Sequence, residues 1–134
     1  MRFFESQVNT KTVELTSIPQ TYPEPSGTDP FPREPYIASF RALGGNFDAT
    51  FIVIHTDPDE ATAEINGLGA VVTYAQSSYP EEKDFIVMGD LNADGSYFNE
   101  ESSSTISGSE YYWVIDNSQD TTTKSTDYTL TLSH

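Results

Sequence analysis

The sequence contains no cysteine, few basic residues and no long apolar run. The absence of cysteine excludes disulfides, cysteine-based zinc sites and a thiol nucleophile, and it leaves the redox compartment undetermined. No run approaches the roughly 20 apolar residues that cross a bilayer, and the opening MRFFESQVNTK has no apolar stretch before a small-residue cleavage site. We therefore expect a soluble chain without a signal peptide or a membrane partner, whose localisation is unknown.

Basic residues are scarce while acidic residues are plentiful. Six Lys and Arg against 21 Asp and Glu give a formal net charge of -15. Such a charge repels a polyanion unless cations or a separate basic surface intervene. The excess is consistent with a solvated acidic surface, and equally with carboxylates that bind divalent cations. The 134 residues, 36% of them hydrophobic, suffice for one globular domain or part of one.

The first quarter of the chain predicts a hairpin and then a long loop. Residues 1–18 alternate around a polar QVNTK segment, which is typical of two short strands joined by a turn. Residues 19–35 hold six of the eight prolines, too many for a helix or a central strand. The aromatic residues Tyr22 and Phe31 favour an ordered loop over a flexible linker.

The centre of the chain predicts strand, helix and strand. Residues 36–43 alternate as a strand before a turn at 44–46, and ATFIVI (49–54) suits a strand buried on both faces. Asp57 then offers an N-cap and Pro58 a first helical position, ahead of apolar spacings that end near Ser78. Further strands are expected at 85–88, 111–115 and 129–134. This order predicts an α+β fold with a crossover unit in a mixed sheet covered by helices.

Two candidate catalytic residues follow the buried strands. His55 and Asp90 each stand where a strand leaves the sheet, and ligands gather at such carboxyl ends. His55 can be a structural histidine bonded to backbone at a helix entrance, or a general acid or base. Both interpretations remain open on position alone.

The GDLNAD segment offers a second set of polar side chains. Asp90, Asn92 and Asp94 are ordinary turn formers. If the extended backbone continues, however, Asp90 and Asn92 face the same side and suit Mg²⁺ or Ca²⁺, with the amide free to donate to a phosphate. Together with His55 they suggest metal-assisted phosphodiester chemistry, whereas Asp94 is better explained as a turn residue.

Four segments, in order, carry a resemblance to a known family: TDPFPREPYIASF, FIVIHTDPDEATAEINGL, FIVMGDLNADGSYF and YYWVIDNSQDTTTKST. From about Arg2 to Thr126 the chain resembles the second half of deoxyribonuclease I, within the endonuclease/exonuclease/phosphatase superfamily. The resemblance implies two mixed sheets packed face to face with helices outside. Residues 1–134 would then be a single partial domain with about one sheet and its helix, whose inner face is exposed or covered by a second chain or a homodimer.

The resemblance also implies roles for individual residues. His55 matches the catalytic histidine, and Asp90 and Asn92 match the GDxN pair at the metal or water and the phosphate. Two residues match DNA contacts and six match structural calcium loops; for the calcium positions a plain polar loop is the alternative. The DNA contacts are Arg33 and Tyr97, and the calcium positions are Asp29, Phe31 (through its carbonyl), Glu34, Asp120, Thr122 and Thr126. The implied cofactors are catalytic Mg²⁺ and structural Ca²⁺, and the implied substrate is DNA.

The chain departs from the family at both ends. An Asn and a Glu for the catalytic metal would precede Arg2, and DYTLTLSH stands where Tyr-Asp-Arg and Ser-Asp-His motifs are expected, which leaves His134 as a doubtful match. We expect the parent domain to be a metal-dependent DNA endonuclease and this chain alone to be weakly active or inactive. The alternatives are a superfamily phosphodiesterase for lipid head groups or phosphate monoesters, and a non-catalytic calcium-stabilised binding module.

Overall fold

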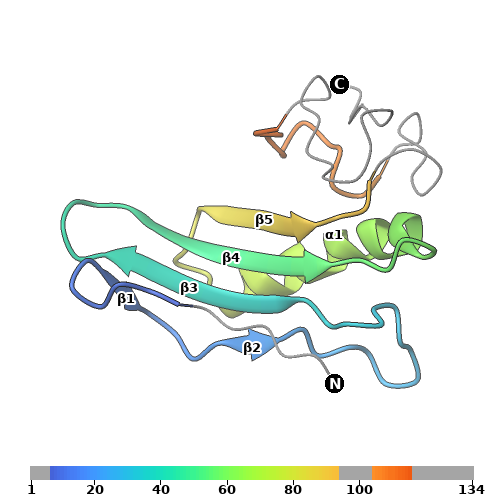
Figure 1. Cartoon of the computed structure of the whole chain (residues 1–134), viewed down its shortest axis with the longest axis horizontal. Helices are drawn as coiled ribbons and strands as arrows, with labels where there is room; N and C mark the ends of the chain where they lie inside the picture. Colours follow the sequence, from blue (N-terminus) through green and yellow to red (C-terminus); the bar gives the residue numbers. More distant parts are fainter. Residues whose placement is uncertain (1–6, 94–103, 116–134) are drawn as a thin grey trace.

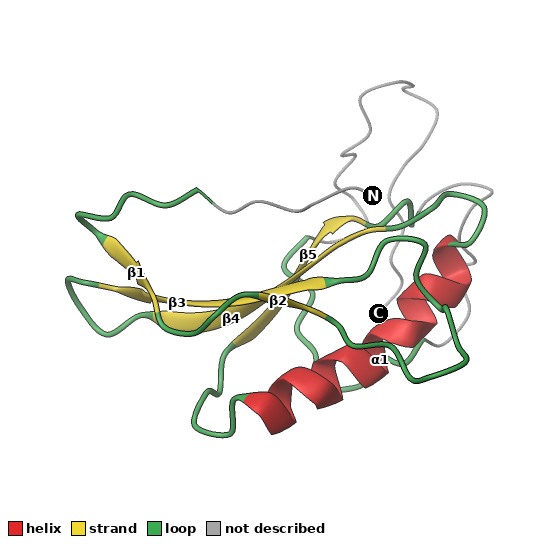
Figure 2. Cartoon of the chain, turned by 90° about the horizontal axis from the view of Figure 1, so that it is seen from below, coloured by secondary structure: helices red, strands yellow, loops and turns green. Residues whose placement is uncertain are grey.

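A five-stranded mixed sheet with one helix on one face forms the centre of the computed structural model, which describes residues 7–93 and 104–115 (Figures 1 and 2). The elements are β1 (Val13–Leu15), β2 (Gln20–Thr21), β3 (Tyr36–Ala42), β4 (Asp48–His55), α1 (Ala61–Ser78) and β5 (Phe85–Asp90). The sheet order is β1-β3-β4-β5, and β2 also pairs with β3. The predicted α+β class and the strand-helix-strand unit are confirmed.

Strand direction reverses on both sides of β3 and is kept between β4 and β5. β3 is antiparallel to β1, β2 and β4, whereas β4 and β5 are parallel. A parallel pair needs a crossover connection, and α1 supplies it. The register pairs Thr50 with Phe85 at one end and His55 with Asp90 at the other. The carboxyl ends of β4 and β5 therefore coincide.

The core lies between α1 and the sheet. Ile52 and Ile54 of β4 are fully buried against Ile65 and Leu68 of α1. Side chains at alternate positions of a strand share one face, and spacings of three and four do so on a helix. Burying each such side chain contributes roughly 1.5–3 kcal/mol. This layer fixes β4, and with it the position of the residue that ends β4.

The proline-rich segment is an ordered loop, as its aromatic residues predicted. Phe31 is 2% exposed, and its ring lies edge-on to Tyr22 at 5.9 Å between centroids. Tyr22 in turn meets Tyr74 of α1 at 5.6 Å. The segment also holds β2, which the sequence analysis missed because two residues carry no periodicity. The aromatic contacts attach this loop to the helix.

Two element predictions need correction, and two others fall outside the described residues. Helix α1 begins at Ala61, because Asp57 instead opens a turn in which its carbonyl accepts the Glu60 N–H at 3.0 Å. Residues 111–115 form no strand, and Tyr112 is 89% exposed; an extended segment needs a hydrogen-bonded neighbour, and no described strand pairs with it. The turn expected in QVNTK is present at Asn9. The first strand of that hairpin and the strand at 129–134 lie outside the described residues.

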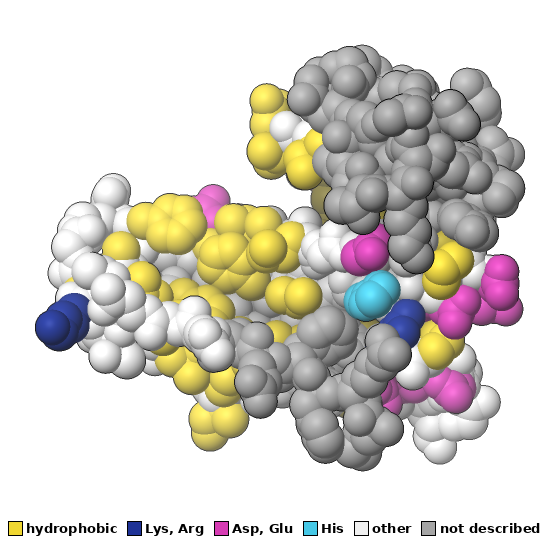
Figure 3. Space-filling model, viewed as in Figure 1, with side chains coloured by type: hydrophobic (Ala, Val, Ile, Leu, Met, Phe, Trp, Pro, Cys, Tyr) yellow, Lys and Arg dark blue, Asp and Glu magenta, His cyan; other side chains and the backbone are white. Residues whose placement is uncertain are grey.

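One face of the sheet carries apolar side chains that no described element covers. The sequence predicted β4 to be buried on both faces, but Phe51 and Val53 are only half-buried. Their cross-strand neighbours Ile86 and Met88 are exposed. Figure 3 shows hydrophobic side chains gathered along this face. We call the side chains of Phe40, Phe51, Val53, Ile86 and Met88 the open face.

The described residues include no helix with the length and apolar character that a membrane span requires.

Candidate active site

His55 and Asp90 lie side by side at the carboxyl ends of β4 and β5. They are cross-strand partners, and the His55 Nε2 lies 3.8 Å from the Asp90 Oδ2. Their side chains are 41% and 65% exposed, so both are accessible to a ligand. Register partners in a parallel pair project to the same side of the sheet. A single sheet edge therefore presents an imidazole beside a carboxylate, on the side that carries the open face.

Arg33 reaches the same edge from the loop before β3. Its Nε donates a hydrogen bond to the backbone carbonyl of His55 at 2.9 Å. The guanidinium is a planar, permanently charged group that suits phosphate. Its terminal nitrogens are not used in this bond, so the positive charge remains next to the histidine. The resemblance expects Arg33 to contact the DNA backbone, and that role stays a prediction.

Asn92 is arranged differently from what its spacing suggested. β5 ends at Asp90, and Asn92 adopts a left-handed φ of 45°, so the assumed extended continuation is wrong. The Asn92 Nδ2 donates to the Thr56 carbonyl at 2.9 Å, and the Asn92 N–H donates to the Asp90 Oδ1 at 3.2 Å. Asparagine tolerates this backbone region better than most residues. The amide thus joins the segments after β4 and β5.

Gly89 explains how Asp90 comes so close to β4. Its φ is 142°, and a Cβ built there would lie 1.8 Å from the Ile54 carbonyl oxygen. A side chain at this position is sterically excluded. The glycine that seemed to end an apolar run therefore permits close approach of two strand ends.

The sequence analysis missed two residues of the site, Thr56 and Glu64. Thr56 is buried, and its N–H donates to the Asp90 carbonyl at 3.0 Å. Glu64 is 1% exposed, and its Oε1 accepts the Asp57 N–H at 2.7 Å. Desolvation by burial raises the pKa of the Glu64 carboxyl, although that hydrogen bond and the nearby charge of Arg33 act in the opposite direction. The sequence feature that could have revealed Glu64 is an acidic residue on the apolar stripe of α1.

The first expected calcium loop brings acids together at its surface. Asp29 and Glu34 are exposed, while Phe31 is buried and its N–H donates to the Glu24 Oε1 at 3.0 Å. The pKa of Glu24 is raised, mainly by desolvation and also by Asp29 and Glu34 nearby. Sequence reasoning missed Glu24, an acid between two prolines. Tyr97 and the second expected loop with Asp120, Thr122 and Thr126 lie outside the described residues.

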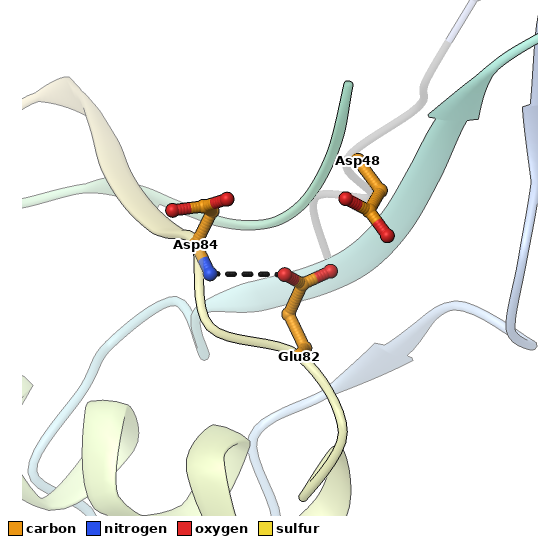
Figure 4. A group of neighbouring side chains, drawn as sticks. All are labelled: Asp48, Glu82 and Asp84. Carbon is orange, nitrogen blue, oxygen red and sulfur yellow. Dashed lines mark hydrogen bonds between the residues drawn. The ribbon is translucent and has the colours of Figure 1, made fainter. Parts of the chain in front are cut away.

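A separate acidic group lies at the opposite end of β4. Carboxylate oxygens of Asp48, Glu82 and Asp84 all lie within 4.8 Å of one another, which could hold a metal ion (Figure 4). The Asp84 N–H donates to the Glu82 Oε1 at 2.9 Å. Asp48 begins the strand that His55 ends, so at about 3.3 Å per residue the two positions are roughly 20 Å apart. This group is therefore distinct from the candidate active site.

The side chains gathered around His55 indicate what chemistry the site can perform. A histidine beside a carboxylate, with an arginine and a side-chain amide nearby, has the groups needed to transfer a proton and to bind an anionic ligand. These groups come from the carboxyl ends of β4 and β5, from the segment after β5 and from the loop before β3. No family model matches the chain.

Comparison with curated proteins identifies the relationship. The chain is 42% identical to deoxyribonuclease-1 of Gallus gallus over 108 residues, 78% of this chain and 38% of that protein. It is 38% identical to deoxyribonuclease-1 of Ovis aries over 107 residues, 77% of this chain and 41% of that protein. It is also 34% identical to deoxyribonuclease gamma of Rattus norvegicus over 101 residues, 72% of this chain and 32% of that protein.

Over about three quarters of its residues the chain is thus related to deoxyribonuclease I, and the resemblance found in its sequence is confirmed. It spans about two fifths or less of the length of these relatives. The superfamily placement is consistent with this relationship and with the mixed sheet.

Proposed function

We propose that this chain is a single partial domain of a metal-dependent phosphodiesterase that hydrolyses DNA as an endonuclease. The observation that carries the proposal is the contact between His55 and Asp90 at two parallel strand ends, 3.8 Å apart and accessible. The names of the relatives support DNA as the substrate. The fold supports the same conclusion, because it brings His55, Asp90 and Arg33 together at the carboxyl ends of β4 and β5.

The proposed chemistry divides the work between few side chains. Imidazole exchanges protons near neutral pH, so His55 transfers a proton at the attacking or leaving oxygen of the phosphate. Asp90 orients the imidazole or the water. Arg33 and the amide of Asn92 lie beside this edge and favour the anionic phosphate. Interactions that strengthen as charge develops on the phosphate are the ones that accelerate the reaction.

Divalent cations fit the site only in part. Asp90 offers an exposed carboxylate, a ligand type that Mg²⁺ accepts, but in the described part of the chain no group of three acids or histidines includes it. Mg²⁺ bound there would neutralise charge on the phosphate oxygens. Structural Ca²⁺ would bind the loop of Asp29, the Phe31 carbonyl and Glu34, and a second loop at Asp120, Thr122 and Thr126.

The described residues provide only part of the proposed active site. Among the described residues, Asp90 is the one acid paired with His55 and no element covers the open face; both observations favour a second polypeptide or a second copy of this chain over that face. We therefore propose that the isolated chain is weakly active or inactive, and that a covering chain supplies the remaining metal ligands.

Plasmid nicking tests the proposal. The purified chain is incubated with supercoiled DNA, Mg²⁺ and Ca²⁺, alone and together with the amino-terminal part of a deoxyribonuclease I relative. We expect nicking only with the added part, and a loss of at least ~100-fold in His55→Ala. Asp84→Ala, in the distant acidic group, is the matched control and should retain activity.

Two outcomes would oppose the proposal. Robust nicking by the isolated chain that is lost in His55→Ala would refute its inactivity. Hydrolysis of phospholipid head groups or phosphate monoesters in preference to DNA in a substrate panel would refute the substrate.

A further inference from the structure

The segment directly after the candidate catalytic histidine is held at successive peptide groups by side chains from different elements. Arg33, from the loop before β3, donates to the His55 carbonyl at 2.9 Å. Asn92, beyond β5, donates to the Thr56 carbonyl at 2.9 Å, and the Thr56 N–H donates to the Asp90 carbonyl at 3.0 Å. The next amide, of Asp57, is bonded by Glu64.

Glu64 differs from the other groups in its surroundings. Its side chain comes from the first turn of α1 and is 1% exposed. Its Oε1 accepts the Asp57 N–H at 2.7 Å, a short bond of the charge-assisted kind. Its Oε2 is buried and has no hydrogen-bond partner. An uncompensated carboxylate oxygen in a core is destabilising, so packing alone does not account for an acid here.

An apolar side chain would fill this position with less loss of stability. Its neighbours along α1, Ala61, Ile65 and Leu68, are buried too. What the carboxylate supplies, and an apolar residue cannot, is an acceptor for the amide two residues after His55. Holding that amide limits the rotation of the peptide groups between it and the histidine.

We propose that Glu64 is a positioning residue: its carboxylate fixes the Asp57 amide and thereby the direction in which His55 leaves β4. This inference rests on the proposed role of His55 and goes beyond it, because the Glu64 carboxylate bonds the Asp57 amide and not the histidine itself. Arg33 and Asn92 fix the segment on one side, and Glu64 fixes it from the helix. A catalytic group must be held within about half an ångström of its working position, which such a set of contacts provides.

Three variants of the 134-residue chain separate positioning from packing. Glu64→Met keeps an unbranched buried side chain of similar size and removes the acceptor. Glu64→Gln keeps an oxygen that accepts the Asp57 N–H. Glu60→Ala removes a neighbouring exposed glutamate whose side chain makes no cap hydrogen bond, and serves as the matched control.

The measurements are nuclear magnetic resonance of the His55 ring and hydrogen exchange of the Asp57 amide. The chain has two histidines, and His55→Gln assigns the ring signals. We expect Glu64→Met to melt within a few degrees of the parent, to exchange the Asp57 amide at least ~10-fold faster and to shift the His55 ring signals. Glu64→Gln and Glu60→Ala should retain the parent signals and exchange rates.

The result is independent of nuclease activity, so it can fail or succeed apart from the proposed function. The inference would be overturned if Glu64→Met left the His55 ring signals unmoved and kept the exchange rate of the Asp57 amide within about two-fold of the parent. Failure of Glu64→Gln to retain the parent behaviour would overturn it too, including when Glu64→Met does not fold.

Discussion

At the scale of single residues, the site depends on groups that a motif does not reveal. Gly89 is needed because a Cβ there would clash with the Ile54 carbonyl oxygen. The main chain of Thr56 bonds both Asp90 and Asn92. Neither acts on a substrate. Both keep two strand ends within contact distance, so the chemistry of the edge rests on backbone geometry.

Gly89→Ala is expected to destabilise the chain by about 3 kcal/mol or more, because a methyl group 1.8 Å from a carbonyl oxygen forces β5 away from β4. Denaturant unfolding measures the loss. Gly44→Ala is the matched control, since a Cβ there meets nothing within 4 Å. Equal stabilities of the two variants would contradict this close approach.

Glu64→Gln should change stability in a pH-dependent way. Burial raises the pKa of Glu64 above its ordinary value of 4.5, so the folded state retains a proton that the unfolded state releases. Stability of the parent therefore falls as pH rises above 4.5, and the neutral glutamine removes this loss. We expect the melting temperature of Glu64→Gln relative to the parent to increase by at least ~2 °C between pH 4.5 and pH 7. A constant difference across this range would show that the carboxyl is not desolvated.

Residue types and strand ends were enough to predict His55 and Asp90 as neighbours, because a parallel pair places its carboxyl ends together. The same reasoning could not predict Glu64. Its partner is a backbone amide seven positions away, and which amide points at it depends on where α1 begins. Asn92 shows the same limit, because its φ of 45° reverses the side on which an extended chain would place it.

At the scale of elements, α1 organises two parts of the chain at once. Its apolar stripe packs on the sheet, while Tyr74 and Gly67 receive the aromatic side chains of the proline-rich loop. That loop carries Arg33 to the His55 carbonyl. We therefore expect the contact between the helix and this loop to affect the site through Arg33.

Gly67→Ala tests this contact. Alanine favours a helix over glycine by about 1 kcal/mol, but the added Cβ would lie 2.8 Å from the buried Phe31 ring. We expect a net destabilisation of about 1–3 kcal/mol and faster exchange of the Arg33 Nε–H. Gly44→Ala again provides the comparison, with no change at Arg33. If Gly67→Ala were more stable than the parent chain, the proline-rich loop would be able to move away from the added methyl group at little cost.

Periodicity predicted the long elements well and the element ends poorly. The helix from 61 to 78 and the strands at 36 and 85 follow from apolar spacing, which depends on many residues. The start of α1 was placed at Asp57 because Asp-Pro resembles a cap, yet those residues form a separate turn. Apolar composition indicated a strand at 111–115, but pairing depends on a neighbouring strand that composition does not specify.

At the scale of the whole molecule, the acidic side chains and the apolar open face lie on different parts of the surface. The chain carries a formal charge of -15, and its described acids gather at loops and at the amino end of β4. The open face is apolar and ends at His55 and Asp90. A covering polypeptide would therefore be recognised by apolar contact and would meet the candidate active site at its edge.

Met88→Lys tests whether the open face is accessible. Met88 is 48% exposed, so a lysine there should change the stability of the isolated chain by less than about 0.5 kcal/mol. We expect the parent to bind an apolar fluorescent dye and the variant to bind it at least ~3-fold less. Gln76→Lys adds the same charge at an exposed position of α1 and should leave dye binding unchanged. Equal dye binding by all three chains would mean that the face is already covered.

The register between β4 and β5 has a consequence for how such chains can change in length. His55 faces Asp90 because of the residues counted within the two strands, and the connection after α1 at 79–84 does not enter that count. Insertions or deletions in this connection leave the pair intact. One residue added inside β5 would turn Asp90 toward α1 and bring a different side chain opposite the histidine. Gaps between related sequences should therefore accumulate at 79–84 and be rare between Phe85 and Asp90.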